Sequence, residues 1–197
     1  MGKIVVFNSV TLDGVMQAPG RPDEDARGGF PFGGWAIPYA DQQLGIAAGE
    51  SMATTGGLLL GRRTYEDFYS VWPNRTDNPY TEVLNNSPKY VASRTLQEPL
   101  PWMNSILLKG NVTDEVAALK ERLEKDLVVL GSGELLQTLM GHDLVDRYIL
   151  LIHPVVLGTG TRLFRDGGSY SRLQLVSSRA TSTGVLIATY QPQEKES

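Results

Sequence analysis

The clearest structural signal in this chain is the stretch Leu127-Val128-Val129-Leu130-Gly131-Ser132-Gly133-Glu134-Leu135-Leu136. Four consecutive apolar residues, two of them β-branched, predict a strand that is buried on both faces. The Gly-Ser-Gly turn leads directly into residues 134–140, whose apolar positions have helical spacing. A strand that turns through glycines into a helix directs free backbone N–H groups at the space above it, which suits a phosphate group. The turn lacks the third glycine of the full dinucleotide-binding motif, so by itself it also fits a tight connection that binds nothing.

Length and composition indicate one globular domain over residues 1–197, with 41% hydrophobic and 20% charged residues. The formal net charge of -4 argues against a general nucleic-acid-binding surface. The absence of cysteine excludes disulfides, thiolate metal sites and cysteine catalysis, and it fits the cytoplasm. We identify no candidate metal ligands. No apolar run reaches membrane-spanning length, and the apolar run at residues 4–7 is too short for a signal peptide, so we expect a protein without a membrane partner.

Short apolar runs predict five further strands, at residues 4–7, 58–60, 89–92, 105–108 and 146–153. Helical patterns lie between them, at residues 39–54, from 65 to the Trp72-Pro73 break, at 81–84 and at 113–123, the last with Thr113 as its N-cap. Residues 171–182 and 185–190 have β-rich patterning around Thr183-Gly184, which predicts a hairpin. We therefore predict an α/β fold with a mainly parallel sheet flanked by helices and an antiparallel C-terminal hairpin at its edge.

Residues 17–34 form a polar, glycine-rich segment without apolar periodicity. The segment contains the acidic run Asp23-Glu24-Asp25, and Phe30, Phe32 and Trp35 lie at its far end. Loops of this length in compact domains are usually functional lids or disordered insertions. Because the aromatic residues give the segment something to pack with, we predict that it is a lid loop, and we call it the lid segment.

Three of the predicted strands end in residues that suit phosphate binding, at 61–64 (Gly-Arg-Arg-Thr), 93–95 (Ser-Arg-Thr) and 131–133 (Gly-Ser-Gly). In an open α/β sheet, ligands bind outside the carboxyl ends of the strands. Guanidinium groups bind phosphate oxygens in a forked geometry, hydroxyls donate to them, and glycines allow close approach. Each arginine taken singly also fits a solvated surface cation. Together the three junctions favour an adenine dinucleotide with a 2′-phosphate, whose extra charge Arg62, Arg63 or Arg94 would neutralise.

The residues around these junctions resemble known reductases. The run Leu59-Leu60-Gly61-Arg62-Arg63-Thr64-Tyr65-Glu66 resembles the Gly-Arg-x-Thr-x-Glu strand–helix junction of dihydrofolate reductase. Residues 34–41 resemble the Trp-x-x-Pro-x-acid segment of that enzyme, with one extra residue before the acid. Residues 9–14 and 144–164 are closer to the reductase half of the bifunctional deaminase–reductase of riboflavin synthesis. We identify the chain as a stand-alone member of this dihydrofolate reductase-like superfamily, with a resemblance that covers roughly residues 4–164.

The resemblance implies NADPH as the cofactor, a homodimer, and hydride transfer to a C=N or C=O group of a small pterin-, pyrimidine- or ribosylaminopyrimidine-like substrate. The nicotinamide is expected near residues 12–16, under the lid segment. By similarity, the residues that bind the cofactor are Gly14, Gly61, Arg62, Arg63, Thr64, Ser93, Arg94, Gly131, Ser132, Gly133, Glu134 and Leu136.

Four further residues are candidates for the chemistry. Hydride transfer requires the two reacting atoms about 3–3.5 Å apart and a proton for the reduced atom. Asp41 is the first candidate for positioning substrate or relaying that proton and Asp13 is the second, although Asp41 also fits a first-turn helix acid and Asp13 a turn former. Trp35 and His153 are candidate substrate contacts. Trp35 also fits a packing role at the base of the lid, and His153 that of a structural hydrogen-bonding group.

Two alternative functions remain open. A non-catalytic nucleotide- or flavin-binding protein would keep the same cofactor-side residues. An authentic dihydrofolate reductase would accept folate, but the extra residue before Asp41 and the long lid segment argue against this. The deaminase half of the bifunctional enzyme needs a Cys/His zinc site that a chain without cysteine does not supply, so only the reductase step is expected.

Overall fold

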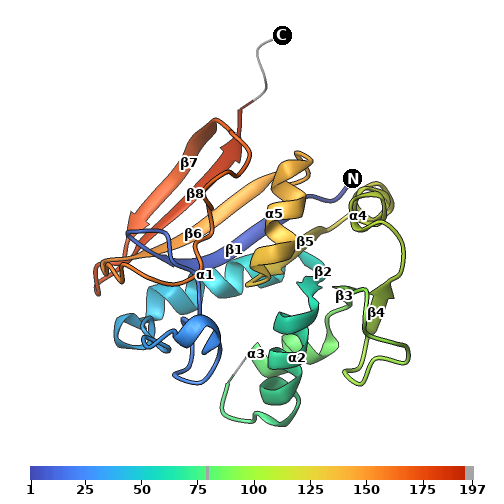
Figure 1. Ribbon diagram of the computed structural model, residues 1–197, viewed down its shortest axis with the longest axis horizontal. Helices are drawn as coiled ribbons and strands as arrows, with labels where there is room; N and C mark the ends of the chain where they lie inside the picture. Colours follow the sequence, from blue (N-terminus) through green and yellow to red (C-terminus); the bar gives the residue numbers. More distant parts are fainter. Residues whose placement is uncertain (79, 194–197) are drawn as a thin grey trace.

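The computed structural model describes residues 1–78 and 80–193. Within them, the strands form one sheet in the order β4-β3-β2-β5-β1-β6-β8-β7 (Figure 1). Their bounds are Ile4–Thr11 (β1), Thr55–Gly61 (β2), Lys89–Ala92 (β3), Ser105–Leu108 (β4), Asp126–Leu130 (β5), Arg147–His153 (β6), Leu173–Ala180 (β7) and Leu186–Pro192 (β8). The strands β1 to β6 are parallel, whereas β8 runs antiparallel to both β6 and β7. The predicted parallel sheet with an antiparallel hairpin at its edge is confirmed.

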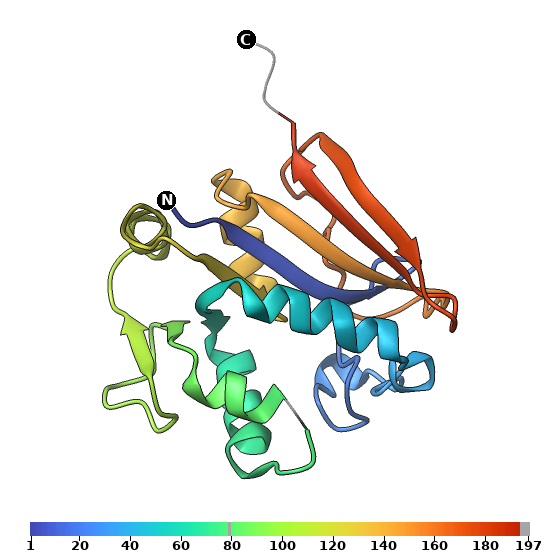
Figure 2. The same cartoon turned by 180° about the vertical axis from the view of Figure 1, so that it is seen from behind.

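Helices cover both faces of the sheet, as the two opposite views show (Figures 1 and 2). Their bounds are Gln42–Ala53 (α1), Arg62–Val71 (α2), Tyr80–Asn86 (α3), Val112–Arg122 (α4) and Gly133–Gly141 (α5). Side chains alternate along each strand, so Ile4 and Val6 pack with α4 and α5, while Val5 faces the side of α1, α2 and α3. The central strands are therefore buried on both faces, as their continuous apolar runs predicted.

Several element boundaries differ from the sequence prediction. The first strand continues through Asn8 to Thr11. The prediction that Thr113 caps α4 is wrong, because the side chain of Asn111 accepts a hydrogen bond from the Thr113 amide at 2.9 Å. Asn and Thr are both good N-caps, but Asn111 has the extended backbone of an N-cap, so the helix starts at Val112, earlier than predicted. The predicted helix at 39–54 begins only at Gln42, after a separate 3₁₀ turn at Ile37–Tyr39.

The lid segment contains one short 3₁₀ turn at Arg27–Gly29 and is held by polar contacts. The Gln17 side chain donates to the carbonyl oxygens of Asp25 and Arg27 at 3.1 and 3.0 Å. Arg21 binds Asp67 of α2, with Nη2 and Oδ1 2.5 Å apart. Phe30 and Trp35 are buried, as expected for residues that pack the segment down, whereas Phe32 is 44% exposed. The lid function itself stays a prediction.

No helix in the described residues is both long and apolar enough to cross a membrane. Nor do residues 1–78 and 80–193 bring together three or more His, Cys, Asp or Glu side chains that could hold a metal ion.

Candidate cofactor and active site

The strand order brings the three predicted junctions to one place. β3, β2 and β5 are consecutive in the sheet, and Gly61 pairs with Ala92 at the ends of β2 and β3. The Gly61 amide donates to Oγ of Ser132 at 3.0 Å, and the Ser132 amide donates to Oγ1 of Thr64 at 3.0 Å. The junctions at 61–64 and 131–133 are thus in direct contact, with the junction at 93–95 beside them on β3.

The turn after β5 depends on a left-handed backbone. Gly131 and Ser132 both have a φ of 57°, and a Cβ at Gly131 would lie 3.1 Å from Oγ1 of Thr64. Glycine fits here because it has no side chain to meet Thr64 and adopts positive φ without strain. Asn8 fixes the turn, because its Oδ1 accepts a hydrogen bond from the Gly131 amide at 2.7 Å. Sequence analysis missed Asn8, although a buried amide side chain within an apolar strand was an available signal.

The first turn of α5 presents free donors at this position. The amides of Gly133, Glu134 and Leu135 have no acceptor in the described part of the chain, as is usual for the first residues of a helix. The positive end of the helix dipole coincides with them. A Cβ at Gly133 would lie 3.4 Å from both Sδ of Met16 and Nη2 of Arg165, so the helix start sits close to the loop that follows β1. This geometry suits a bound phosphate group.

The predicted arginines are available for an anion. Arg62, Arg63 and Arg94 are exposed. Nη1 of Arg62 lies 3.4 Å from Oε2 of Glu66, one helical turn away. Arg63 and Arg94 form no ion pair within residues 1–78 and 80–193. Neither guanidinium is therefore held by a carboxylate at ion-pair distance in these residues, which suits both groups to binding phosphate.

Further positive charge surrounds Glu134. Its Oε1 lies 2.8 Å from Nη2 of Arg165, and this hydrogen bond, with the charges of Arg165, Arg63 and Arg27, holds the pKa of Glu134 below its usual value. A cavity of about 350 Å³ opens here. It is lined by Glu134, Gly160, Thr161, Arg162, Arg165 and Asp166. Arg27 and Arg165 were missed because they come from loops far away in sequence from the three junctions.

Asp13 and Gly14 lie in the turn after β1. The Asp13 carboxylate accepts hydrogen bonds from the Thr11 hydroxyl at 2.6 Å and from the amides of Leu157 and Gly158 at 3.2 and 2.8 Å. The Thr11 bond is the main reason that the pKa of Asp13 is lowered. Gly14 has a φ of 79°, and its carbonyl accepts from the Leu163 amide at 2.9 Å. Both residues connect β1 to the 155–163 loop.

Asp41 is the N-cap of α1. Its Oδ1 accepts from the Leu44 amide at 3.0 Å, and its Oδ2 accepts from the amide and hydroxyl of Ser182 at 3.1 and 2.9 Å. The Leu44 bond is the largest cause of its lowered pKa. Asp41 thereby connects α1 to the turn of the β7–β8 hairpin. The catalytic assignments of Asp41 and Asp13 stay predictions.

Trp35 and His153 pack against one another. Their rings meet edge to face with centroids 5.1 Å apart, and Tyr39 approaches His153 at 5.6 Å. Trp35 Nε1 donates to the Gln17 carbonyl at 2.7 Å, while Nδ1 of His153 lies 2.9 Å from the Leu151 carbonyl oxygen. Burial lowers the pKa of His153. This geometry favours the packing and hydrogen-bonding roles, and the predicted substrate contacts stay untested.

The structure therefore brings most of the predicted cofactor residues together, with one difference. The Leu136 side chain is fully buried in the core between α5 and the sheet, so it supports the helix from below and presents no surface to a ligand. Asp41, Trp35 and His153 form a separate group beside the ends of β1, β6 and the hairpin.

This strand order and the clustered strand ends define a dihydrofolate reductase-like α/β domain. The chain is similar to dihydrofolate reductase of Enterococcus faecalis, solved with NADP(H), with a TM-score of 0.63 and 14% identity over 98% of both chains. A putative riboflavin biosynthesis protein of Shewanella sp. PV-4 gives a TM-score of 0.71 and 24% identity over 98% of this chain and 99% of that one.

The match to the RibD C-terminal domain family spans residues 2–187, and the chain belongs to that family. The uncharacterized protein YyaP of Bacillus subtilis (strain 168) is 31% identical over 194 residues, which cover 95% of this chain and 94% of YyaP. The resemblance identified in the sequence is thus confirmed.

Proposed function

We propose that this protein is an NADPH-dependent reductase that acts on a C=N or C=O group of a small pterin-, pyrimidine- or ribosylaminopyrimidine-like substrate. The observation that carries the proposal is the direct contact between the junctions at 61–64 and 131–133, through the hydrogen bonds of Ser132 with Gly61 and Thr64. Membership of the RibD C-terminal domain family and the NADP(H)-bound neighbour of similar fold support it.

The residues present fit such a cofactor. The free amides of α5 and the glycine turn would hold a pyrophosphate, and Arg165 and Arg27 would add positive charge. Arg62, Arg63 and Arg94 would neutralise a 2′-phosphate, which is the group that separates NADPH from NADH. When bound, NADPH supplies the hydride. The protein contributes binding, orientation and exclusion of water.

Both candidate carboxylates have lowered pKa values and are therefore ionised at neutral pH. An ionised carboxylate accepts hydrogen bonds and has no proton to donate. Most of the acceptor capacity of Asp13 and Asp41 is already used by amides and hydroxyls of the fold. We therefore propose that both are positioning residues that hold the loops around the substrate.

The test is a fluorescence titration of the protein with NADPH and NADH. We expect sub-millimolar binding of NADPH. Replacing Arg62 and Arg63 together by Ala should weaken NADPH about tenfold to a hundredfold and leave NADH nearly unchanged, because charge-assisted bonds to the 2′-phosphate are lost. Equal losses for both nucleotides would refute the 2′-phosphate assignment, and no binding of either would refute the reductase. Dihydrofolate-dependent oxidation of NADPH should be negligible, and robust turnover would favour an authentic dihydrofolate reductase.

We further propose that the protein is a homodimer. We also propose that it is located in the cytoplasm, because a chain without cysteine suits a reducing compartment. β7 is an edge strand, and its Leu175 and Val176 are 51% and 53% exposed. An exposed apolar edge strand in a soluble domain calls for a partner or for protection against self-association. Light scattering that gives a monomeric mass at all protein concentrations would remove this proposal.

A further inference from the structure

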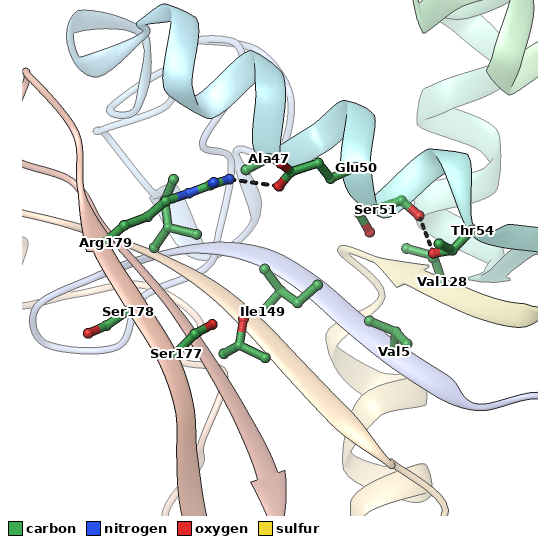
Figure 3. Close-up of a pocket in the computed structure, with 12 residues that line it drawn as sticks. Val5, Ala47, Glu50, Ser51, Thr54, Val128, Ile149, Ser177, Ser178 and Arg179 are labelled. Atoms are coloured by element: carbon green, nitrogen blue, oxygen red, sulfur yellow. Dashed lines mark hydrogen bonds and ion pairs between the residues drawn. The ribbon is translucent and has the colours of Figure 1, made fainter.

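A second cavity, of about 310 Å³, lies on the α1 face of the sheet, away from the three junctions (Figure 3). Its floor is formed by apolar side chains from four adjacent strands, Val128 of β5, Val5 of β1, Ile149 of β6 and Ile187 of β8. Val5 is the second residue of β1 and Val128 is the central residue of β5, whereas the cofactor residues follow the carboxyl ends of their strands. The cavity is therefore distinct from the candidate cofactor site.

The α1 wall of this cavity carries an unpaired hydroxyl group. Ser51 is 7% exposed, and its Oγ has no hydrogen-bond partner in the described residues. Figure 3 shows its side chain directed into the cavity, next to Thr54. A buried hydroxyl that lacks a partner is unfavourable, so this group is prepared to bond to something that enters. A serine hydroxyl both donates and accepts.

The mouth of the cavity is electrically balanced. Glu50 of α1 and Arg179 of β7 face one another there, with Oε2 and Nη2 2.8 Å apart (Figure 3). Every other residue that lines the cavity is uncharged, and Thr54, Ser177 and Thr189 add hydroxyl groups to the lining. A charged ligand would have to break the Glu50–Arg179 pair to find a counter-charge. The lining therefore favours an uncharged ligand.

We propose that this cavity binds a small uncharged ring compound with an amide-type edge. The apolar floor receives the face of the ring, and the free Ser51 hydroxyl meets its amide-type edge. Oγ1 of Thr54 donates to the Ser51 carbonyl at 3.3 Å, so it meets the same edge as an acceptor. The volume is at the small end of ligand pockets, which fits a compact molecule. This site goes beyond the proposed reductase activity and does not depend on it.

Benzamide is the probe, with benzoate and toluene as comparators of the same ring size. We expect benzamide to cause saturable NMR shifts of the backbone amides of Ala47, Ser51, Thr54 and Arg179, and none at residues 61–64 or 131–134. Benzoate and toluene should bind at least about tenfold more weakly than benzamide. Benzoate would find no free counter-charge in the cavity, and toluene forms no hydrogen bonds. Shifts confined to the strand ends, or equal binding of the three compounds, would overturn the proposal.

Variants of Ser51 provide the second readout. Ser51→Ala should weaken benzamide about tenfold by loss of one hydrogen bond, and Ser51→Thr, which keeps a hydroxyl, should restore most of the affinity. Ser87→Ala is the matched control and should have no effect, because the hydroxyl of this half-buried serine donates to the Val83 carbonyl outside the cavity. Unchanged binding to Ser51→Ala would contradict the assignment, whatever the wild-type affinity.

Discussion

The two halves of the carboxyl edge of the sheet differ in how their polar groups are used. At the ends of β3, β2 and β5, Arg63 and Arg94 form no ion pair, and the first amides of α5 have no acceptor, in the described chain. At the ends of β1 and β6, the groups nominated for chemistry are already engaged. Asp13 is bonded to Thr11 and Gly158, and Asp41 to Leu44 and Ser182.

This difference gives a criterion that distinguishes a binding site from a network of structural hydrogen bonds. A side chain of suitable chemistry is available to a ligand only if the fold has not satisfied it. By this criterion the first half is prepared for an anion, whereas the carboxylates of the second half mainly hold the turn after β1, α1 and the hairpin together. Three predictions test the contrast.

The largest effect is expected for Gly131→Ala, at the end of β5. The substitution combines a left-handed φ of 57° with a Cβ only 3.1 Å from Oγ1 of Thr64. We expect the free energy of unfolding to fall by about 2 kcal/mol. The affinity for NADPH should fall more than tenfold, because the turn shifts. Chemical denaturation and the fluorescence titration measure the two effects.

Gly167→Ala is the matched control for this substitution. Gly167 has a φ of 74°, but nothing lies within 4 Å of its added Cβ. The Gly167→Ala variant should therefore lose about 1 kcal/mol of unfolding free energy from backbone strain alone, and its affinity for NADPH should be unchanged. If both variants lose NADPH equally, the contact with Thr64 is not what shapes the site.

A smaller effect on NADPH binding is expected for Asp13→Ala, at the ends of β1 and β6. The substitution removes the acceptor of the Thr11 hydroxyl and of the Leu157 and Gly158 amides. We expect a loss of about 2 kcal/mol in unfolding free energy, with NADPH affinity within about twofold of the wild type. A variant that keeps its stability but loses all turnover would show that Asp13 acts on the substrate, and the contrast between the halves would break.

The smallest effect is expected for Asp41→Asn, because Asn is also a good N-cap. The folded-state pKa of Asp41 is lowered by its bonds to Leu44 and Ser182, so its charge stabilises the fold above pH about 4. That contribution is lost as the pH falls through the folded-state pKa, since the unfolded chain then binds more protons. Wild type and variant should thus differ in Tm at pH 7, and the difference should shrink as the pH falls below about 4. A difference that stays constant with pH would contradict this.

Much of the fold was predictable because its signals are local. Runs such as Leu127–Leu130 bury both faces of a strand wherever it lies in the sheet, and the glycine turn after them begins a helix. The same holds for the terminal hairpin. The boundary of α4 was missed because Asn111 and Thr113 are both adequate caps, and only the backbone conformation decides between them.

The site was predictable only in part. The glycines, hydroxyls and arginines at the strand ends are recognisable from the sequence, because each group follows directly after a strand. Asn8 and Arg165 do not, because their roles depend on partners far along the chain, such as Gly131 for Asn8 at a separation of 123 residues. The roles of Trp35 and His153 likewise became visible only once their rings were seen to pack together.

Local sequence patterns were enough to identify the strand segments and the glycine-, hydroxyl- and arginine-containing junctions that suit phosphate groups. The tertiary structure decided that β5 lies between β2 and β1, so that Ser132 contacts both Gly61 and Thr64. It also decided which polar groups stay free. The physical reason is that periodicity and turn chemistry act between neighbours in sequence, whereas strand order and hydrogen-bond satisfaction arise from packing between residues far apart in the chain.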